Sequence, residues 1–235
     1  MFGVTFGNKH SYRDWGLIPK SRPVISPPAP KTNYISIPEA DGSLDLTEGL
    51  SGEVKFEDRT ITFEFVVIEA RKRWSRIYSD IMNYLHGQRM KIILDEDPKY
   101  YYLGRLQVNE WESDKKTSTI TITGTVEPYK YDLWGSLDPW EWNPFNFEED
   151  VIREYNDLEV YRSLEFTIVG SRKSVVPTFI VSSNGAGMQV TFEGVTYNLQ
   201  DGSNRVVNIV IKDGEHTLVF TGMGTVSIDY RGGSL

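Results

Sequence analysis

A clear alternation of apolar and polar positions begins at Arg59 and continues for nine residues. Ile61, Phe63, Phe65 and Val67 fall on one side of an extended chain, with threonine and glutamate among the residues between them. A period of two residues is typical of a strand that buries one face. The pattern therefore predicts a half-buried strand that begins near Arg59.

Directly after this strand the apolar spacing changes to three and four residues. Six apolar side chains keep this helical spacing, and basic residues occupy the opposite side. The six are Trp74, Ile77, Tyr78, Ile81, Met82 and Leu85. We expect an amphipathic helix from about Glu69 to His86. Gly87 is its natural end, because glycine readily adopts the left-handed conformation that closes many helices.

Strand patterns resume after the helix and include one run of alternating threonines. Lys91 to Leu94 and Tyr100 to Trp111 are predicted strands, with the acidic run 95–97 at the turn between them. In the next strand the polar positions are Thr119, Thr121, Thr123 and Thr125. Apolar residues or glycine lie between them, so one face packs inward and the other is a hydrated ladder of hydroxyl groups.

Prolines and aromatic residues mark the two irregular parts of the chain. Six prolines fall within residues 1–40, which predicts an extended N-terminal arm that wraps around a neighbour and does not form core. Residues 133–157 contain prolines and the large aromatic side chains of Trp134, Trp140, Trp142 and Phe145. We interpret this segment as a strap whose aromatic residues pack between two domains.

The last 78 residues read as short strands separated by turn signals. The expected strands are 164–169, 177–182, 188–192, 195–199, 206–211, 217–220 and 225–230. The turn signals are Asn184-Gly185, Asp201-Gly202, Asp213-Gly214 and Gly222-Met223-Gly224. This spacing predicts an antiparallel sandwich. The domain prediction is residues 1–132, the strap 133–157, and the sandwich 158–235.

Composition narrows the function classes. The formal net charge of −8 disfavours tight binding of nucleic acid but suits a wall past which DNA slides without sticking. The chain has no cysteine, which excludes disulfides and thiolate chemistry. We find no leader pattern and no apolar run of membrane-spanning length, so we expect a protein made in a cytoplasm without membrane insertion.

Candidate catalytic and metal-binding residues are few. His10, His86 and His216 show no metal-ligand spacing, and the acidic run 95–97 is expected to be a solvated hairpin tip and not a calcium loop. The glycine pairs near residues 185 and 222 do not open a helix, so we expect turns and no phosphate site. We therefore expect no enzyme, no cofactor and no metal.

Three segments taken together resemble the distal tail protein family of siphophages and of prophages in Gram-positive hosts. Their order along the chain, which spans nearly its whole length, carries the resemblance. The segments are 41–48 with 59–65 and the helix, 140–151, and 188–199 with 214–218 and 222–231.

The resemblance implies a mainly β structural protein of the virion. The expected fold is a tail-tube-like β-sandwich or split barrel with one flanking α-helix, followed by a small galectin-like or jelly-roll sandwich. Six copies would form a homo-hexameric ring around a DNA channel at the distal end of a long non-contractile tail. The ring would join the tail tube protein to the tail-associated hub protein of the baseplate, serving host attachment and genome ejection. In this family the outer domains can carry receptor-binding proteins.

Within this interpretation Thr119, Thr121, Thr123 and Thr125 are the candidate channel-lining residues. Two alternatives remain open. A carbohydrate-binding module or adhesin would recognise cell-wall sugars through Trp134, Trp140 and Trp142 of the strap, as stacking platforms, or through the outer sandwich. A tail-tube protein would share the first domain but is not expected to have the strap and the C-terminal sandwich.

Overall fold

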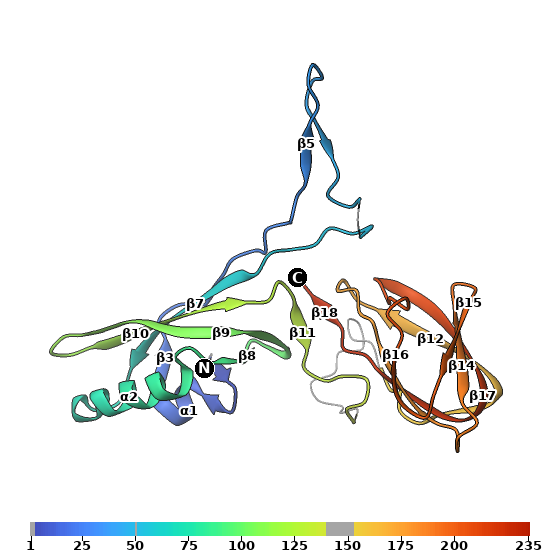
Figure 1. The fold of residues 1–235 in the computed structure, drawn as a ribbon. Coiled ribbons are helices and arrows are strands. Elements are labelled where there is room, and N and C mark those ends of the chain that lie inside the picture. The colour runs from blue at the N-terminus through green and yellow to red at the C-terminus, as the bar shows by residue number, and fades with distance from the viewer. Residues whose placement is uncertain (1–2, 50, 140–152) are drawn as a thin grey trace. The chain divides into compact units, whose positions relative to one another are not determined.

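The computed structural model describes residues 3–49, 51–139 and 153–235, and the chain is mainly β (Figure 1). It divides into two compact units. The first comprises Met1–Asp97, Tyr101–Lys130 and Leu235, and the second comprises Pro98–Tyr100 and Tyr131–Ser234. The prediction of a mainly β protein built from curled, sandwich-type sheets is confirmed. The boundaries 1–132, 133–157 and 158–235 stay a prediction, since residues 140–152 of the strap lie outside the described part.

An antiparallel sheet forms the body of the first unit. Along its main path the strands run in the order β2-β1-β8-β9-β10-β7-β3, and β4 also pairs with β7. Their bounds are β1 Val4–Phe6, β2 Lys9–His10, β3 Leu17–Pro19, β4 Val24–Ile25, β7 Arg59–Val67, β8 Arg89–Leu94, β9 Asp97–Ser113 and β10 Ser118–Val126. The predicted strands of this region are therefore present, with β9 longer than expected at both ends.

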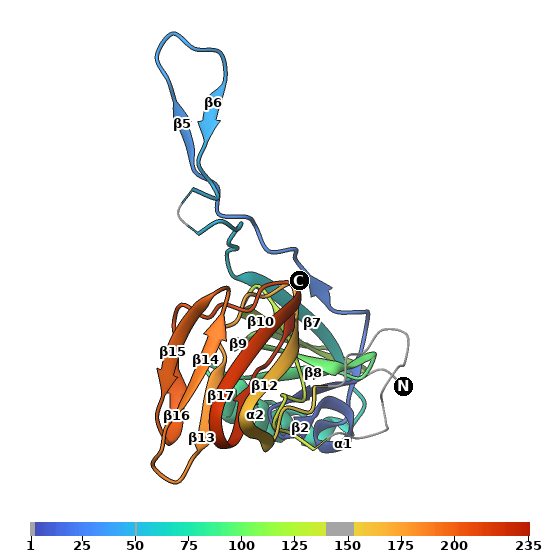
Figure 2. The same cartoon turned by 90° about the vertical axis from the view of Figure 1, so that its right-hand side faces the viewer.

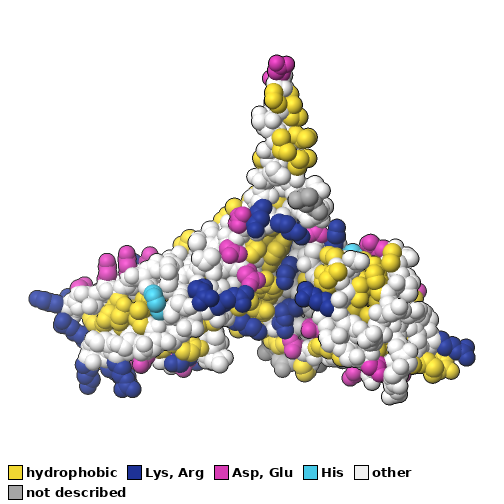
Figure 3. Space-filling view, viewed as in Figure 1, with side chains coloured by type: hydrophobic (Ala, Val, Ile, Leu, Met, Phe, Trp, Pro, Cys, Tyr) yellow, Lys and Arg dark blue, Asp and Glu magenta, His cyan; other side chains and the backbone are white. Residues whose placement is uncertain are grey.

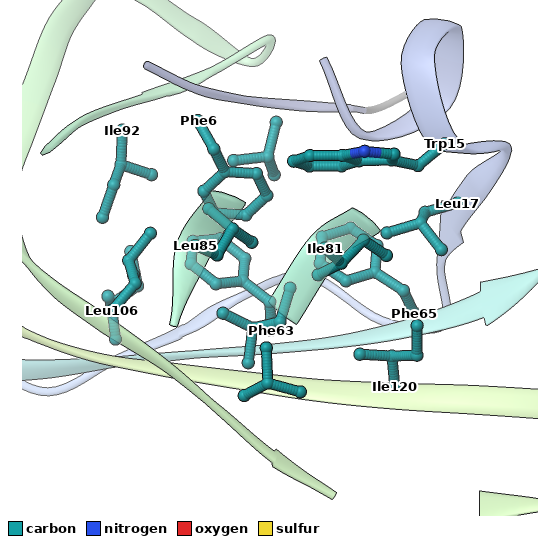
Figure 4. Packing of buried hydrophobic residues seen from close by; sticks show 14 of the residues in the cluster. Phe6, Trp15, Leu17, Phe63, Phe65, Ile81, Leu85, Ile92, Leu106 and Ile120 are labelled. Carbon is teal, nitrogen blue, oxygen red and sulfur yellow. The ribbon is translucent and has the colours of Figure 1, made fainter. Parts of the chain in front are cut away.

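The apolar face of this sheet packs on the amphipathic helix. Phe63 and Phe65 of β7 stack with ring centroids 5.9 Å apart, and Ile120 of β10 is buried beside them (Figure 4). The helix α2, Trp74–Leu85, buries Ile81 and Leu85 against the same cluster, after the 3₁₀ turn η1, Arg71–Arg73. Removal of this apolar surface from water is the main stabilising contribution.

The end of α2 follows the predicted rule. His86 is the C-cap residue, and Gly87 adopts a φ of +75° directly after it. The Gly87 N–H then donates to the Leu106 carbonyl oxygen of β9 at 2.8 Å, and the chain continues into β8, which pairs with β9. Glycine is required here because its φ lies in the left-handed region.

The prediction that residues 1–40 avoid the core is wrong for residues 3–19. Phe6 and Leu17 are fully buried, and Trp15 packs with them on the sheet (Figure 4). A short second helix, α1 Ser11–Trp15, lies between β2 and β3 and was not predicted. The prolines misled the prediction because all six fall at Pro19 or later, where β3 ends.

Residues 31–55 form a separate hairpin, which we call the arm. Among the strands that the structure describes, β5, Tyr34–Ser36, and β6, Ser43–Asp45, pair only with each other (Figures 1 and 2). Outside the arm the two chain segments are held by a bridge between Pro30 and Phe56. Nearly every described residue of the arm is exposed, so little besides its own ladder stabilises it.

The second unit contains a curled six-stranded sheet (Figure 2). Its strand order is β15-β14-β17-β13-β16, with β12 paired along β17. The bounds are β12 Leu158–Gly170, β13 Thr178–Ser182, β14 Met188–Phe192, β15 Val195–Leu199, β16 Gly202–Arg205 and β17 Gly214–Asp229. Two short strands, β11 Lys130–Asp132 and β18 Gly233–Ser234, pair with each other. The core of the sheet includes Phe179, Phe220 and Ile228.

Two predictions for this unit are wrong. Gly222 and Gly224 do not form a turn but lie inside the 16-residue strand β17, with φ near +139° and +138°. A side chain at Gly224 would overlap the backbone oxygen of Ser182, so glycine permits a close strand approach. The stretch 206–211 is a loop, not a strand: Ile209 is buried after a turn, and Ile211 forms only an isolated β-bridge with Val175.

Candidate functional site

The open face of the sheet in the first unit is a polar surface built from regular structure. Alternation along β10 buries Ile120 and Ile122 and turns the threonines Thr119, Thr121, Thr123 and Thr125 to the other side. The first three are half-buried, and Thr125 is exposed. The sequence therefore placed all four threonines on one face correctly, whereas their role as channel wall stays a prediction.

Strand register shows what surrounds the threonines. Thr121 lies between Glu64 of β7 and Glu110 of β9, and both carboxylates are exposed. Thr123 accepts a hydrogen bond from Gln107 Nε2 at 3.2 Å and donates to Asn109 Oδ1 at 3.0 Å. The face thus combines hydroxyl, amide and carboxylate groups that bind water. It also holds two cations, since Lys20 lies 3.1 Å from Glu64 and Arg105 lies opposite Thr125.

At one end of this face the sheet is hollowed into an open pocket of about 730 Å³. Of its charged lining residues, Arg89 pairs with Glu127 and Arg105 donates to the Gly87 carbonyl oxygen, whereas Asp58 is exposed to water. His86 also lines it, and its Nδ1 accepts a hydrogen bond from the Val108 N–H at 3.2 Å. The pocket is therefore a hydrated depression whose polar groups are largely occupied.

His10 and His216, which the sequence offered as candidate metal ligands, form hydrogen bonds within the first and the second unit. His10 Nδ1 accepts the N–H groups of Tyr12 and Arg13, so Nε2 carries the proton and lies 3.1 Å from Asp95 Oδ2. His216 contacts the backbone of Lys212.

The acidic run 95–97 lies at the β8–β9 turn, and each carboxylate is close to a different basic side chain. Besides the His10 contact, Glu96 lies 3.5 Å from Arg22 and Asp97 lies 2.6 Å from Lys130. Within residues 3–49, 51–139 and 153–235, no cluster of three or more His, Asp or Glu side chains has metal-binding geometry. In the same part of the chain, no helix is both long and apolar enough to cross a bilayer.

Of the four strap residues expected to pack between domains, the structure describes only Trp134, which is 38% exposed. Trp140, Trp142 and Phe145 lie outside the described residues. The predicted packing of the strap between domains, and its alternative use as a sugar platform, both stay predictions.

The arm presents an exposed apolar surface that the sequence did not reveal as such. Figure 3 shows apolar side chains along the arm and acidic ones at its tip. Its exposed apolar residues are Tyr34, Ile35, Ile37, Leu44 and Leu46. Residues 33–49 contain four carboxylates and no lysine or arginine. Exposed apolar surface of this kind marks an interaction site.

The burial of Arg59 is a further feature that was not predicted from the sequence. It is 6% exposed, and its guanidinium carbon lies 5.0 Å from the ring centroid of Tyr102. Burial lowers the pKa of Arg59 and raises that of Tyr102, because both charged forms lose hydration. The signal was in the alternation, since Arg59 occupies the same inward side as Ile61 and Phe63.

Comparison with known proteins relates this architecture to a phage tail protein. No protein-family model matches the chain. No curated protein sequence matches it. Among solved structures it is similar to the crystal structure of the Dit protein (gp 19.1) of phage SPP1, described as a paradigm of the hub adsorption apparatus in phages that infect Gram-positive bacteria. The two share 12% identity with a TM-score of 0.59, covering 98% of this chain and 99% of that chain. The chain thus has a fold similar to that of the SPP1 Dit protein over nearly its whole length.

Proposed function

We propose that this chain is a structural protein of a phage tail. Six copies form a ring at the distal end of a long non-contractile tail, between the tail tube protein and the tail-associated hub protein. The observation that carries this proposal is the fold similarity to the SPP1 Dit protein over nearly the full length of both chains. Its position in the virion and its binding to receptor-binding proteins are parts of the same proposal.

The arm supports self-assembly. An isolated two-stranded hairpin is only marginally stable in water. This hairpin also exposes apolar side chains, with Tyr34 60% and Leu44 48% exposed. A ring of identical copies uses one surface of each copy against a different surface of the next. An arm that lies on the neighbouring copy provides one half of such a contact and covers its own apolar residues.

The polar sheet face supports a channel for DNA. We propose that Thr119, Thr121, Thr123 and Thr125 line the ring, with the carboxylates of nearby Glu64 and Glu110 on the same face. Such a wall offers hydroxyl groups for hydration, and Arg105, the arginine opposite Thr125, donates to the Gly87 carbonyl oxygen, so we expect DNA to pass with little binding.

The direct test is the assembly state of the purified full chain. Native mass spectrometry and negative-stain microscopy are expected to show a six-membered annulus, alone or after mixing with the tube and hub proteins of the same phage. Failure of the chain to enter any circular assembly with them would refute the proposal.

The wall has its own test. Wild-type rings are expected not to retain duplex DNA in a gel-shift assay at low salt. Rings carrying Thr121→Arg and Thr123→Arg are expected to retain it, with binding that weakens as salt rises. Rings of a control with Thr191→Arg and Thr196→Arg, which adds the same charge on strands β14 and β15, should behave like wild type. Equal behaviour of both variants would exclude the threonine face from the wall.

A further inference from the structure

Basic side chains gather at one end of the first unit, where η1, the start of α2 and the β9–β10 turn lie. Figure 3 shows Lys and Arg side chains grouped at this end. Six of them are exposed, and we call these six the basic patch. Its members are Arg71, Lys72, Arg73, Arg76, Lys115 and Lys116.

An aromatic stack brings the two parts of the basic patch together. Tyr78 of α2 packs against Trp111 of β9, with ring centroids 4.3 Å apart and the ring planes 18° apart. The start of α2 is thereby held beside the β9–β10 turn. Asp114 in this turn has a lowered pKa, mainly because backbone N–H groups of the turn, first that of Thr117, donate to it, and also because the Arg71 guanidinium is near.

The basic patch keeps an excess of positive charge despite its acidic neighbours. Glu69 lies 2.8 Å from Arg73, and Asp80 lies 4.0 Å from Arg76. Together with Asp114 these are three carboxylates among six basic side chains, in a chain whose formal net charge is −8. A local excess of positive charge on an acidic protein attracts an acidic partner.

The arm is an acidic surface of matching character. Residues 33–49 carry four exposed carboxylates and no lysine or arginine, and these are Glu39, Asp41, Asp45 and Glu48. Glu39 and Asp41 lie between β5 and β6, at the tip. The apolar side chains of the arm also have a counterpart, since Ile68, close to the basic patch, is 51% exposed. Apolar contacts with charged groups around them are typical of protein interfaces.

We propose that the basic patch of one copy receives the acidic tip of the arm of a second copy. The inference rests on the proposed self-assembly and names the surface that the arm contacts. Opposite charges guide the arm to this surface and fix its orientation there. Each copy offers an arm to one neighbour and a patch to the other, which is the type of contact that closes a ring. Exposed ion pairs are individually weak, so the effect depends on several acting together.

The test reverses the charge on one side of the contact at a time, in the full chain. The arm variant carries Glu39→Lys and Asp41→Lys. The patch variant carries Lys72→Glu and Lys115→Glu, which leaves both ion pairs of the basic patch in place. Assembly is followed by native mass spectrometry over a concentration series, and folding by thermal melting of the dilute, unassembled chain.

Two controls make the same charge changes at exposed positions of the second unit. Glu159→Lys with Glu193→Lys matches the arm variant, and Glu193, like Glu39, has a positive φ. Arg172→Glu with Arg205→Glu matches the patch variant. Both controls should assemble like wild type.

The arm variant and the patch variant should each raise the protein concentration at half-assembly by roughly tenfold or more at low salt, because like charges then face each other across the contact. Raising the salt from about 0.1 M to about 1 M should reduce this difference, since it shortens the screening length from about 10 Å to about 3 Å. All melting temperatures should stay close to that of wild type, because every substituted side chain is exposed.

Mixing the two variants tests whether the contact joins different copies. In the mixture each reversed arm can meet a reversed patch, and each unchanged arm can meet an unchanged patch. The mixture should therefore form rings in which the two chains alternate in equal numbers, which a heavy-isotope label on one of them makes visible by mass. One chain that carries both pairs of substitutions should assemble by itself.

Several results would overturn the inference while leaving the ring intact. These are wild-type assembly of the arm variant or the patch variant, an equal loss in the matched control, and a mixture that does not assemble. If the mixture fails and the chain with both pairs of substitutions assembles, the contact lies within one chain. If the patch variant assembles normally but loses binding of duplex DNA that wild type shows, the basic patch serves nucleic acid instead. If wild type forms no assembly at any concentration or with its tail partners, the proposed ring fails first, and the inference fails with it.

Discussion

Replacing Ile35 and Leu44 with serine tests whether the arm is an assembly element. These two residues face each other across the β5–β6 ladder and are 46% and 48% exposed in the single chain. Full burial of such a side chain is worth about 1.5–3 kcal/mol, so covering the exposed half of each contributes about 1 kcal/mol. The double variant should therefore weaken each contact between copies by about 2 kcal/mol, or roughly thirtyfold.

The loss should appear in assembly and not in folding. Because both side chains are already half in water, we expect the melting temperature of the unassembled chain to stay within the small range typical of surface substitutions. Sedimentation velocity over a concentration series measures the shift in assembly, and Val207→Ser, at a residue 70% exposed in the second unit, is the matched control. Assembly of the double variant at wild-type concentrations would refute the reasoning, as would an equal effect of the control.

Three further predictions concern the second unit. Gly224→Ala places a side chain against a carbonyl oxygen of β13 at a φ of +138°, and should lower the free energy of unfolding by about 3 kcal/mol or more in urea titrations. Gly214→Ala, at a φ of +102° with open space around it, should cost about 1 kcal/mol, and equal losses would contradict the steric argument. Asp201 has a pKa below its ordinary 3.8, chiefly because it accepts a hydrogen bond from the Ser183 hydroxyl, so its stabilising effect is complete above pH 3.8 and disappears as the pH falls through the lowered pKa. Asp201→Asn should reduce the fall in the free energy of unfolding at acid pH. A fall equal to that of wild type would show that Asp201 does not cause it. Burial raises the pKa of Tyr230 above 10.0, so the contribution of its neutral phenol to the free energy of unfolding is complete below pH 10.0 and is lost as the pH rises through the raised pKa. Tyr230→Phe should reduce this loss of stability at alkaline pH, measured by chemical denaturation. A loss equal to that of wild type would contradict the prediction.

Periodicity predicted those parts of the fold in which one face is buried by regular packing. The alternation from Arg59 and the helical spacing around Ile81 correspond closely to β7 and α2, because burial against a common core imposes those periods. It also placed Thr121 and the other threonines of β10 on the open face. Each of these features depends on a pattern that is local in the sequence.

The missed features depend on contacts between distant segments. From the sequence Gly224 resembles a turn residue. Only the structure shows that its missing side chain allows β17 to lie close to the backbone of β13. Ile209 and Ile211 are buried without a strand, because a loop can also fill a core. Arg59 was visible on the inward side of β7, but whether a buried guanidinium has a partner cannot be derived from spacing.

The separate ladder of the arm also has a kinetic consequence. Because β5 and β6 pair with no other strand, the hairpin can open locally at a free energy far below that of global unfolding. Its backbone amides should therefore exchange hydrogen early in the free chain and become protected when two molecules meet. A segment that orders on contact searches a larger volume before it settles, which speeds encounter between subunits.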